Sequence, residues 1–169
     1  MVMPIKGVYI KSNPGDVGDA LIKNITYENI SMQNPLWWGI YIGPQQQKQP
    51  GGYGPGCFTY PLQPCATNPL VSFEDITLRN VTSTGGLFPA GIVRCNSTNP
   101  CKNFKFDDVH VTSPVWDMFG VGYITEYIQG TEDDDTPIPD FNNQQTVRNS
   151  PLKIVKELVK FLSFQGDYV

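Results

Sequence analysis

Gly-Val-Tyr-Ile-Lys-Ser, residues 7–12, is the stretch that decides the fold, because it recurs further along the chain. Gly-Ile-Tyr-Ile-Gly stands at residues 39–43, and a looser copy, Gly-Ile-Val-Arg-Cys, stands at residues 91–95. Behind each copy lies a segment with residues spaced by two, then three, then two: Ile25, Tyr27, Ile30 and Met32; Ile76, Leu78, Val81 and Ser83; Phe104, Phe106, Val109 and Val111. A spacing of two keeps side chains on one face of a strand, so each segment is predicted to be two short strands joined by a bend.

Polar residues fall in register at these bends. They stand just before the first strand of each segment, at Asn24, Asp75 and Asn103, and just before the second, at Asn29, Asn80 and Asp108. Asn and Asp tolerate left-handed backbone angles, which a sharp corner between strands needs. Self-similarity with polar corners and no helix in the repeat predicts an all-β solenoid, a parallel β-helix of about three rungs. An antiparallel sandwich is the alternative, but hairpins do not predict two corner columns that match at three sites.

The third copy raises a question of register. If it is aligned on its glycine, Arg94 points inward at the position of Ile10 and Ile42. Burying an unpaired guanidinium is costly, whereas a shift of one residue exchanges the two faces of the strand. We therefore expect the shifted register, with Val93 and Cys95 inside and Arg94 outside.

The repeats divide the chain into two regions. Residues 1–113 are predicted to hold the rungs, with an insertion at 44–70 whose Gly, Pro and Gln content is typical of a loop. Residues 114–169 are predicted to be an irregular tail with an amphipathic helix at 151–162. We expect this helix to cap the last rung, a role favoured over membrane binding. The acidic run at 132–135 is interpreted as a solvated loop, because the ligand spacing of a calcium site is missing.

Composition excludes several classes of partner. The 169-residue chain has 12 Lys and Arg against 16 Asp and Glu, a formal net charge of -4. It has no basic stripe, which argues against nucleic-acid binding, and no apolar stretch long enough to cross a bilayer. We expect no signal peptide in this stretch, because residues 1–6 run directly into the first predicted strand. Because the chain begins inside a repeat, we expect it to be the end of something longer.

Four cysteines form two close pairs in the sequence, Cys57 with Cys65 and Cys95 with Cys101. Sequence alone leaves three connectivities open, and local pairing within each pair is the simplest. A zinc site is disfavoured, because neither spacing is the tight one expected and no His lies nearby.

Asn-x-Ser/Thr sequons occur at Asn24, Asn29, Asn80 and Asn96. Together with paired cysteines they favour a secretory compartment. Asn96 is the sequon expected to carry a glycan, since the other three occupy corner positions.

The first rung, residues 7–12 followed by Ile-Thr-Tyr-Glu-Asn-Ile at 25–30, resembles the polygalacturonase family of glycoside hydrolases. The cysteine loop at 95–101 and Phe-Asp-Asp-Val-His-Val at 106–111 are similar to the C-terminal coils of that family. The resemblance covers residues 7 to about 113. It implies a right-handed parallel β-helix from a secreted enzyme that hydrolyses pectin.

The family binds substrate through an Arg-Ile-Lys strand, where this chain has Tyr9, Ile10 and Lys11. The resemblance therefore implies a substrate-binding role for Lys11, and Tyr9 could stack on a sugar ring. Losing the Arg removes a bidentate carboxylate contact. The family's binding tyrosine on the next rung falls near Gln46, in the insertion. Tyr41, with Trp37 and Trp38, could extend an aromatic platform, or the tryptophans could belong to the core.

The resemblance does not extend to the catalytic carboxylates. Family members are inverting hydrolases whose acid and base lie in Asn-Thr-Asp and Asp-Asp motifs, with a Gly-His-Gly nearby. All three precede the Arg-Ile-Lys strand, and this chain starts six residues before its Gly7. Asp107 and Asp108 match a non-catalytic coil instead, and His110 is expected on the surface. We expect no catalytic residue, metal or cofactor in this chain.

The leading hypothesis is the C-terminal part of a polygalacturonase-like hydrolase of pectin or a related cell-wall polysaccharide. The full-length protein is expected to be a secreted monomer that binds polysaccharide, and the isolated chain is expected to be inactive. A non-catalytic β-helix that binds carbohydrate or caps an assembly is the alternative.

Overall fold

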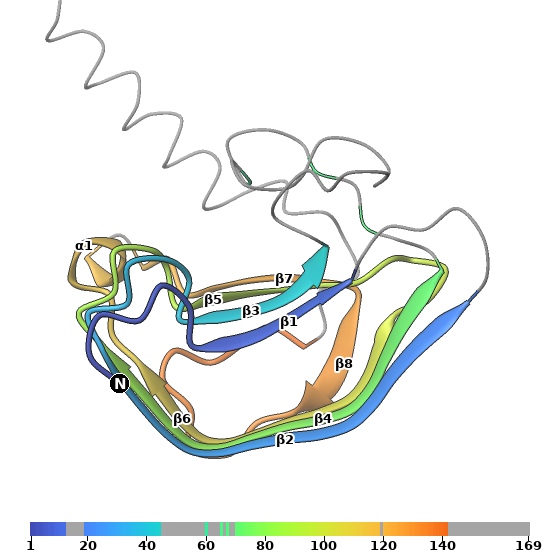
Figure 1. The fold of residues 1–169 in the computed structure, drawn as a ribbon, viewed down its shortest axis with the longest axis horizontal. Helices are drawn as coiled ribbons and strands as arrows, with labels where there is room; N and C mark the ends of the chain where they lie inside the picture. The colour runs from blue at the N-terminus through green and yellow to red at the C-terminus, as the bar shows by residue number, and fades with distance from the viewer. Residues whose placement is uncertain are drawn as a thin grey trace, which may run out of the picture.

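The structure is a computed structural model that describes residues 1–12, 19–44, 60, 65, 67, 70–118 and 120–141. Within them the chain forms two parallel sheets of four strands each, ordered β1-β3-β5-β7 and β2-β4-β6-β8 (Figure 1). The elements are β1 Val8–Ser12, β2 Ala20–Gln33, β3 Ile40–Pro44, β4 Val71–Thr84, β5 Gly91–Arg94, β6 Cys101–Val111, α1 Pro114–Asp117, β7 Tyr123–Glu126 and β8 Ile128–Thr131. The all-β parallel architecture predicted from the repeats is therefore present.

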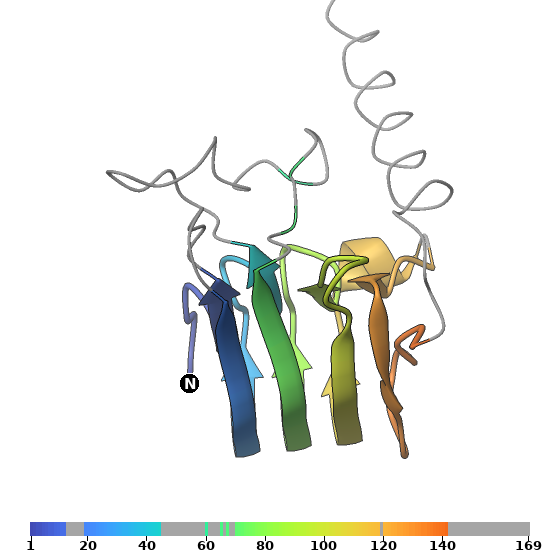
Figure 2. The same ribbon diagram turned by 90° about the vertical axis from the view of Figure 1, so that its right-hand side faces the viewer.

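Each rung consists of one strand from each sheet, and the rungs stack side by side along the axis (Figure 2). Residues at matching repeat positions lie next to one another, as in the register of Ile25 with Ile76 and of Ile76 with Phe104. The stacked apolar columns from both sheets make one core between the sheets, in which Ile76 and Phe104 are fully buried. A solenoid gains its stability from such contacts between neighbouring rungs.

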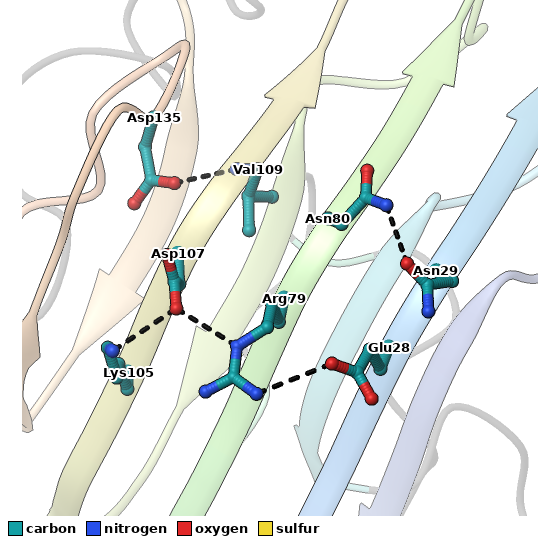
Figure 3. A network of polar contacts seen from close by, with 8 residues as sticks. All are labelled: Glu28, Asn29, Arg79, Asn80, Lys105, Asp107, Val109 and Asp135. Atoms are coloured by element: carbon teal, nitrogen blue, oxygen red, sulfur yellow. Dashed lines mark hydrogen bonds and ion pairs between the residues drawn. The ribbon is translucent and has the colours of Figure 1, made fainter.

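All six predicted corner residues have left-handed backbone angles, with φ between 48° at Asn80 and 60° at Asp108. Their side chains continue the stacking at the surface. Asn80 Nδ2 donates to Asn29 Oδ1 at 2.6 Å (Figure 3), and Asn103 Nδ2 donates to Asp75 Oδ1. The bends lie inside long continuous strands, so the expectation of two separate short strands per segment needs correction. Hydrogen bonds between rungs continue across each corner because neighbouring rungs bend together.

A fourth rung follows Ser113, where the repeat was expected to stop. β7 pairs with β5 and β8 pairs with β6, both in parallel. Past β8 the chain still follows β6, since Thr136 N donates to Val109 O at 3.0 Å. The tail is therefore regular over 123–131. This rung could not be recognised from the sequence, because β8 is only four residues long and its pairing with β6 contains an irregularity between Cys101 and Phe104.

Several predicted features lie outside the described residues. These are Gln46, Cys57 and the helix at 151–162, which remain predictions. Among the residues that the structure does describe, no helix has the length and apolar character needed to cross a membrane.

Candidate substrate-binding face

The outward face of the first sheet carries the predicted binding residues. On β1, Val8 and Ile10 are buried in the core while Tyr9 and Lys11 point outward and are half-buried. This alternation follows from the two-residue period of a strand. Tyr9 is in register with Tyr41 on the next rung, and the two ring centroids lie 5.5 Å apart at 46°. The structure thus brings Tyr9, Lys11 and Tyr41 together on one face.

Tyr41 supports Tyr9 from within this face. Its side chain is only 2 % exposed and packs in a second apolar cluster with Trp38, Tyr60 and Ile92. Burial raises the pKa of its hydroxyl. Of the expected aromatic platform, Tyr9 and Trp37 are half-buried and pack against this cluster. Trp38 is 1 % exposed and belongs to the core, which decides the question that the sequence left open for this residue.

Two lysines lie near Tyr9. Lys6 Nζ lies 3.9 Å from the ring centroid, in a cation–π arrangement. Partial burial raises the pKa of the Tyr9 hydroxyl, and the positive charge of Lys11 opposes this rise. Partial burial also lowers the pKa of Lys6. Sequence analysis did not single out Lys6, because it precedes the strand and has no place in the repeat.

The shifted register expected at Arg94 is confirmed, but the side chain is buried and not exposed to solvent. The register of Ile42 with Val93 is the shifted one, and Val93 and Cys95 lie in the core. Arg94 does lie on the outward face, but it is only 3 % exposed. Its Nε donates to Glu126 Oε2 at 2.8 Å, so the buried guanidinium is paired.

The Arg94–Glu126 pair attaches part of the insertion to the sheet. Arg94 Nη2 donates to the Cys65 carbonyl at 2.8 Å, and the guanidinium lies 3.8 Å from the centroid of the Tyr60 ring. Tyr60 completes the cluster by donating from its hydroxyl to Glu126 Oε1 at 3.2 Å. These contacts satisfy the donors and acceptors of a buried ion pair, as low dielectric surroundings require. Sequence analysis missed Glu126 because it lies on the unrecognised fourth rung.

The outer face of the second sheet holds a row of exposed ion pairs (Figure 3). Arg79 bridges Glu28 at 3.3 Å and Asp107 at 3.0 Å, and Lys105 reaches Asp107 at 3.1 Å. The hydrogen bonds from Arg79 and Lys105 hold the pKa of Asp107 below its usual value. Asp107 therefore serves in a surface network, while its neighbour Asp108 occupies a corner.

Asp108, His110 and Asp134 place one ligand atom each within 4.8 Å of one another, the one such grouping in the described part of the chain. His110 Nε2 lies 2.9 Å from Asp108 Oδ1. Carboxylate oxygens and an imidazole could hold a divalent cation. All three side chains are at least partly exposed, and the His110–Asp108 contact accounts for their closeness without an ion.

The disulfide between Cys95 and Cys101 is present, with the Cα atoms 5.6 Å apart. The pairing of Cys65 with Cys57 stays a prediction. Asn96 is half-buried, and its Nδ2 donates to Thr67 Oγ1 at 2.9 Å. A glycan at this nitrogen would have to replace that bond, and glycosylation of Asn96 also stays a prediction.

Stacked parallel strands with Asn and Asp at their corners define a parallel β-helix, the class to which this chain belongs by its architecture. Its sequence matches the family model of the glycosyl hydrolases family 28 over residues 2–128, which is 127 of 169 residues. The chain belongs to this polygalacturonase family of glycoside hydrolases. The match continues past residue 113 to the start of β8, in agreement with the fourth rung. Comparisons with curated proteins and with solved structures find no match.

Proposed function

We propose that this chain supplies the C-terminal rungs of a secreted glycosidase that acts on pectin or a related uronic-acid polysaccharide. Its part is to bind the sugar chain on the outward face of the first sheet, through Lys11 and Tyr9. The observation that carries this proposal is the half-buried Tyr9–Lys11 pair on β1, in a member of a glycoside hydrolase family. An ammonium group can form a charge-assisted hydrogen bond with a uronate carboxylate.

The catalytic acid and base are proposed to lie outside this chain. Inverting hydrolysis needs two carboxylates set apart by about 6.5–9.5 Å to admit a water. On the strands of the first sheet, Glu126 is the only carboxylate, and it is 2 % exposed and bound to Arg94. Asp107 lies on the other sheet in its own ion pairs.

Several inward apolar side chains of the first rung are incompletely buried, which supports the presence of a further rung in the complete enzyme. Tyr27 and Ile30 are half-buried, whereas Leu78 and Val81, their register partners on the second rung, are fully buried. Apolar lumen residues and an open strand edge are normally covered by another element. We propose that the covering rung belongs to the part of the enzyme that carries the acid and base.

The test combines activity and binding on the purified 169-residue chain. We expect no reducing-sugar release from pectin, polygalacturonate or rhamnogalacturonan, and measurable binding of oligogalacturonate that Lys11→Ala weakens without lowering the melting temperature. Release of sugar that an acidic-residue substitution abolishes would show that catalysis resides here. Binding that Lys11→Ala leaves intact would favour the alternative of a β-helix module that binds carbohydrate elsewhere or has a structural role.

A further inference from the structure

The cations of the described residues fall into two groups. Lys23, Arg79, Arg94 and Lys105 each form an ion pair with a carboxylate. Lys6, Lys11 and Lys102 form none with any described residue. Lys102 is exposed on the second sheet. Lys6, which lies against the Tyr9 ring, and Lys11, two residues after Tyr9 on the same face of β1, are half-buried. Among the described residues, two ammonium groups near Tyr9 without a carboxylate partner are a local excess of positive charge in an acidic chain.

The position of Lys6 is determined by the packing of the residue that follows it. A Cβ atom at Gly7 would overlap Met32 Sδ and would lie 2.6 Å from the carbonyl oxygen of Gly39. The backbone therefore passes tightly against the second rung, and Val8 N donates to the same Gly39 carbonyl at 2.9 Å. This contact holds the chain at the start of β1, so that the Lys6 side chain is directed across the Tyr9 ring.

Partial burial removes water from the Lys6 ammonium, and no described residue supplies an anion in return. Its contact with the Tyr9 ring replaces only part of that hydration, because a cation–π contact is weaker than a charge-assisted hydrogen bond to a carboxylate. Tyr9 packs in turn against Tyr41 on the neighbouring strand, at 5.5 Å between ring centroids. Lys6 and Tyr9 therefore form a preformed site. An anionic group that bound beside the Tyr9 ring would give the Lys6 ammonium a partner.

We propose that Lys6 is a second carboxylate-binding residue, which acts with Lys11 on the outward face beside Tyr9 to select uronic-acid oligosaccharides over neutral ones. This inference rests on the proposed function, and it adds a specificity-determining residue to the same face. Lys6 and Lys11 each bind carboxylate oxygen, and the sugar lies beside the Tyr9 ring, whose face holds the Lys6 ammonium.

The test is calorimetric titration of the 169-residue chain with an oligogalacturonate of defined length and with its fully methyl-esterified counterpart. The ester keeps the sugar rings and removes the negative charges. Lys6→Gln and Lys11→Gln should each raise the Kd for the acidic oligomer roughly tenfold, the loss of one charge-assisted contact. Neither should change the Kd for the ester. Lys102→Gln is the matched control, which removes an unpaired lysine from the other sheet and should leave both Kd values unchanged.

Two further measurements separate binding from folding. Lys6→Arg should keep the affinity for the acidic oligomer, and Lys6→Gln should reduce the salt dependence of its Kd, since fewer charge contacts are screened. If Lys6→Gln behaves like Lys102→Gln while Lys11→Gln weakens binding, the role of Lys6 is refuted and the proposed function stands. If neither substitution changes the Kd, or if the acidic oligomer does not bind, both are refuted.

Discussion

Asp135 is a buried carboxyl group in the segment that follows β8 and lies beside β6. It is only 7 % exposed, and its Oδ1 accepts a hydrogen bond from Val109 N at 2.8 Å (Figure 3). Its Oδ2 and the Tyr123 hydroxyl are both buried and have no hydrogen-bond partner among the described residues. Burial raises the pKa of Asp135 to about 6, the Val109 N–H opposes the rise, and Glu132 adds to it.

We expect Asp135 to make the stability of the protein depend on pH. Because its folded pKa is raised from 3.8 to about 6, the folded state binds more protons than the unfolded state between these values. The free energy of unfolding contributed by this group is therefore lost as pH rises from about 4 to about 6. Asp135→Asn keeps an acceptor for Val109 and removes the charge. It should raise the free energy of unfolding at pH 7 by on the order of 1 kcal/mol.

The measurement is urea unfolding of the wild type and the variant at several pH values from 4 to 7. Their difference isolates Asp135, since the other carboxylates titrate in both proteins. Asp134→Asn is the control, because Asp134 is an exposed neighbour whose left-handed backbone Asn also tolerates. A difference between wild type and Asp135→Asn that is constant over this pH range would contradict the assignment.

At the scale of the strand, the corners determine the shape of each rung. Asn80 has φ 48° in the middle of β4, and its amide donates to Asn29 on the neighbouring rung. A left-handed conformation at this point bends the strand, and its pairing to β2 and β6 skips Asn80 and resumes in the same register at Val81. Residues that tolerate the conformation are therefore required at the same place in each rung.

Asn80→Ala should lower the free energy of unfolding by about 1–2 kcal/mol, since alanine in the left-handed region meets its own carbonyl. Asn80→Gly removes the same side chain and the same hydrogen bond, but has no Cβ to strain. It should therefore cost clearly less than Asn80→Ala in chemical denaturation. Equal losses for the two variants would assign the effect to the Asn29–Asn80 bond and not to the backbone.

The corners and the shifted register of β5 were predictable because both depend on local chemistry. Asn and Asp mark left-handed positions, and Arg94 could not enter the core unpaired. The burial of Arg94 was not predictable, since it depends on Glu126 and on Cys65 from distant parts of the chain. Lys6 was missed for the same reason. Its importance comes from a contact with the Tyr9 ring and not from any place in the repeat.

At the scale of the whole molecule, the rungs differ in how well they are covered. Four apolar residues on β2 are half-buried, while their register partners on β4 lie between two rungs and are buried: Ile22, Ile25, Tyr27 and Ile30 pair with Phe73, Ile76, Leu78 and Val81. Ile25 and Ile76 occupy the same column, and Ile76 is 0 % exposed. In a solenoid each rung is stabilised by its neighbours. A rung that packs against a neighbour on one side only therefore contributes less to the free energy of unfolding.

Ile76→Ala should therefore cost about 2–5 kcal/mol, because it removes buried methyl groups and leaves a cavity between packed rungs. Ile25→Ala should cost less than half as much in the 169-residue chain, since its site is already partly open to water. Thr77→Ala, on the outward face of β4, is the control for substitution in the same strand and should change stability little. Urea unfolding of the three variants measures these differences. In a protein where a further rung covers β2, the cost of Ile25→Ala should rise to that of Ile76→Ala. Equal costs in the chain alone would mean that the first rung is already covered, and that no further rung is needed there.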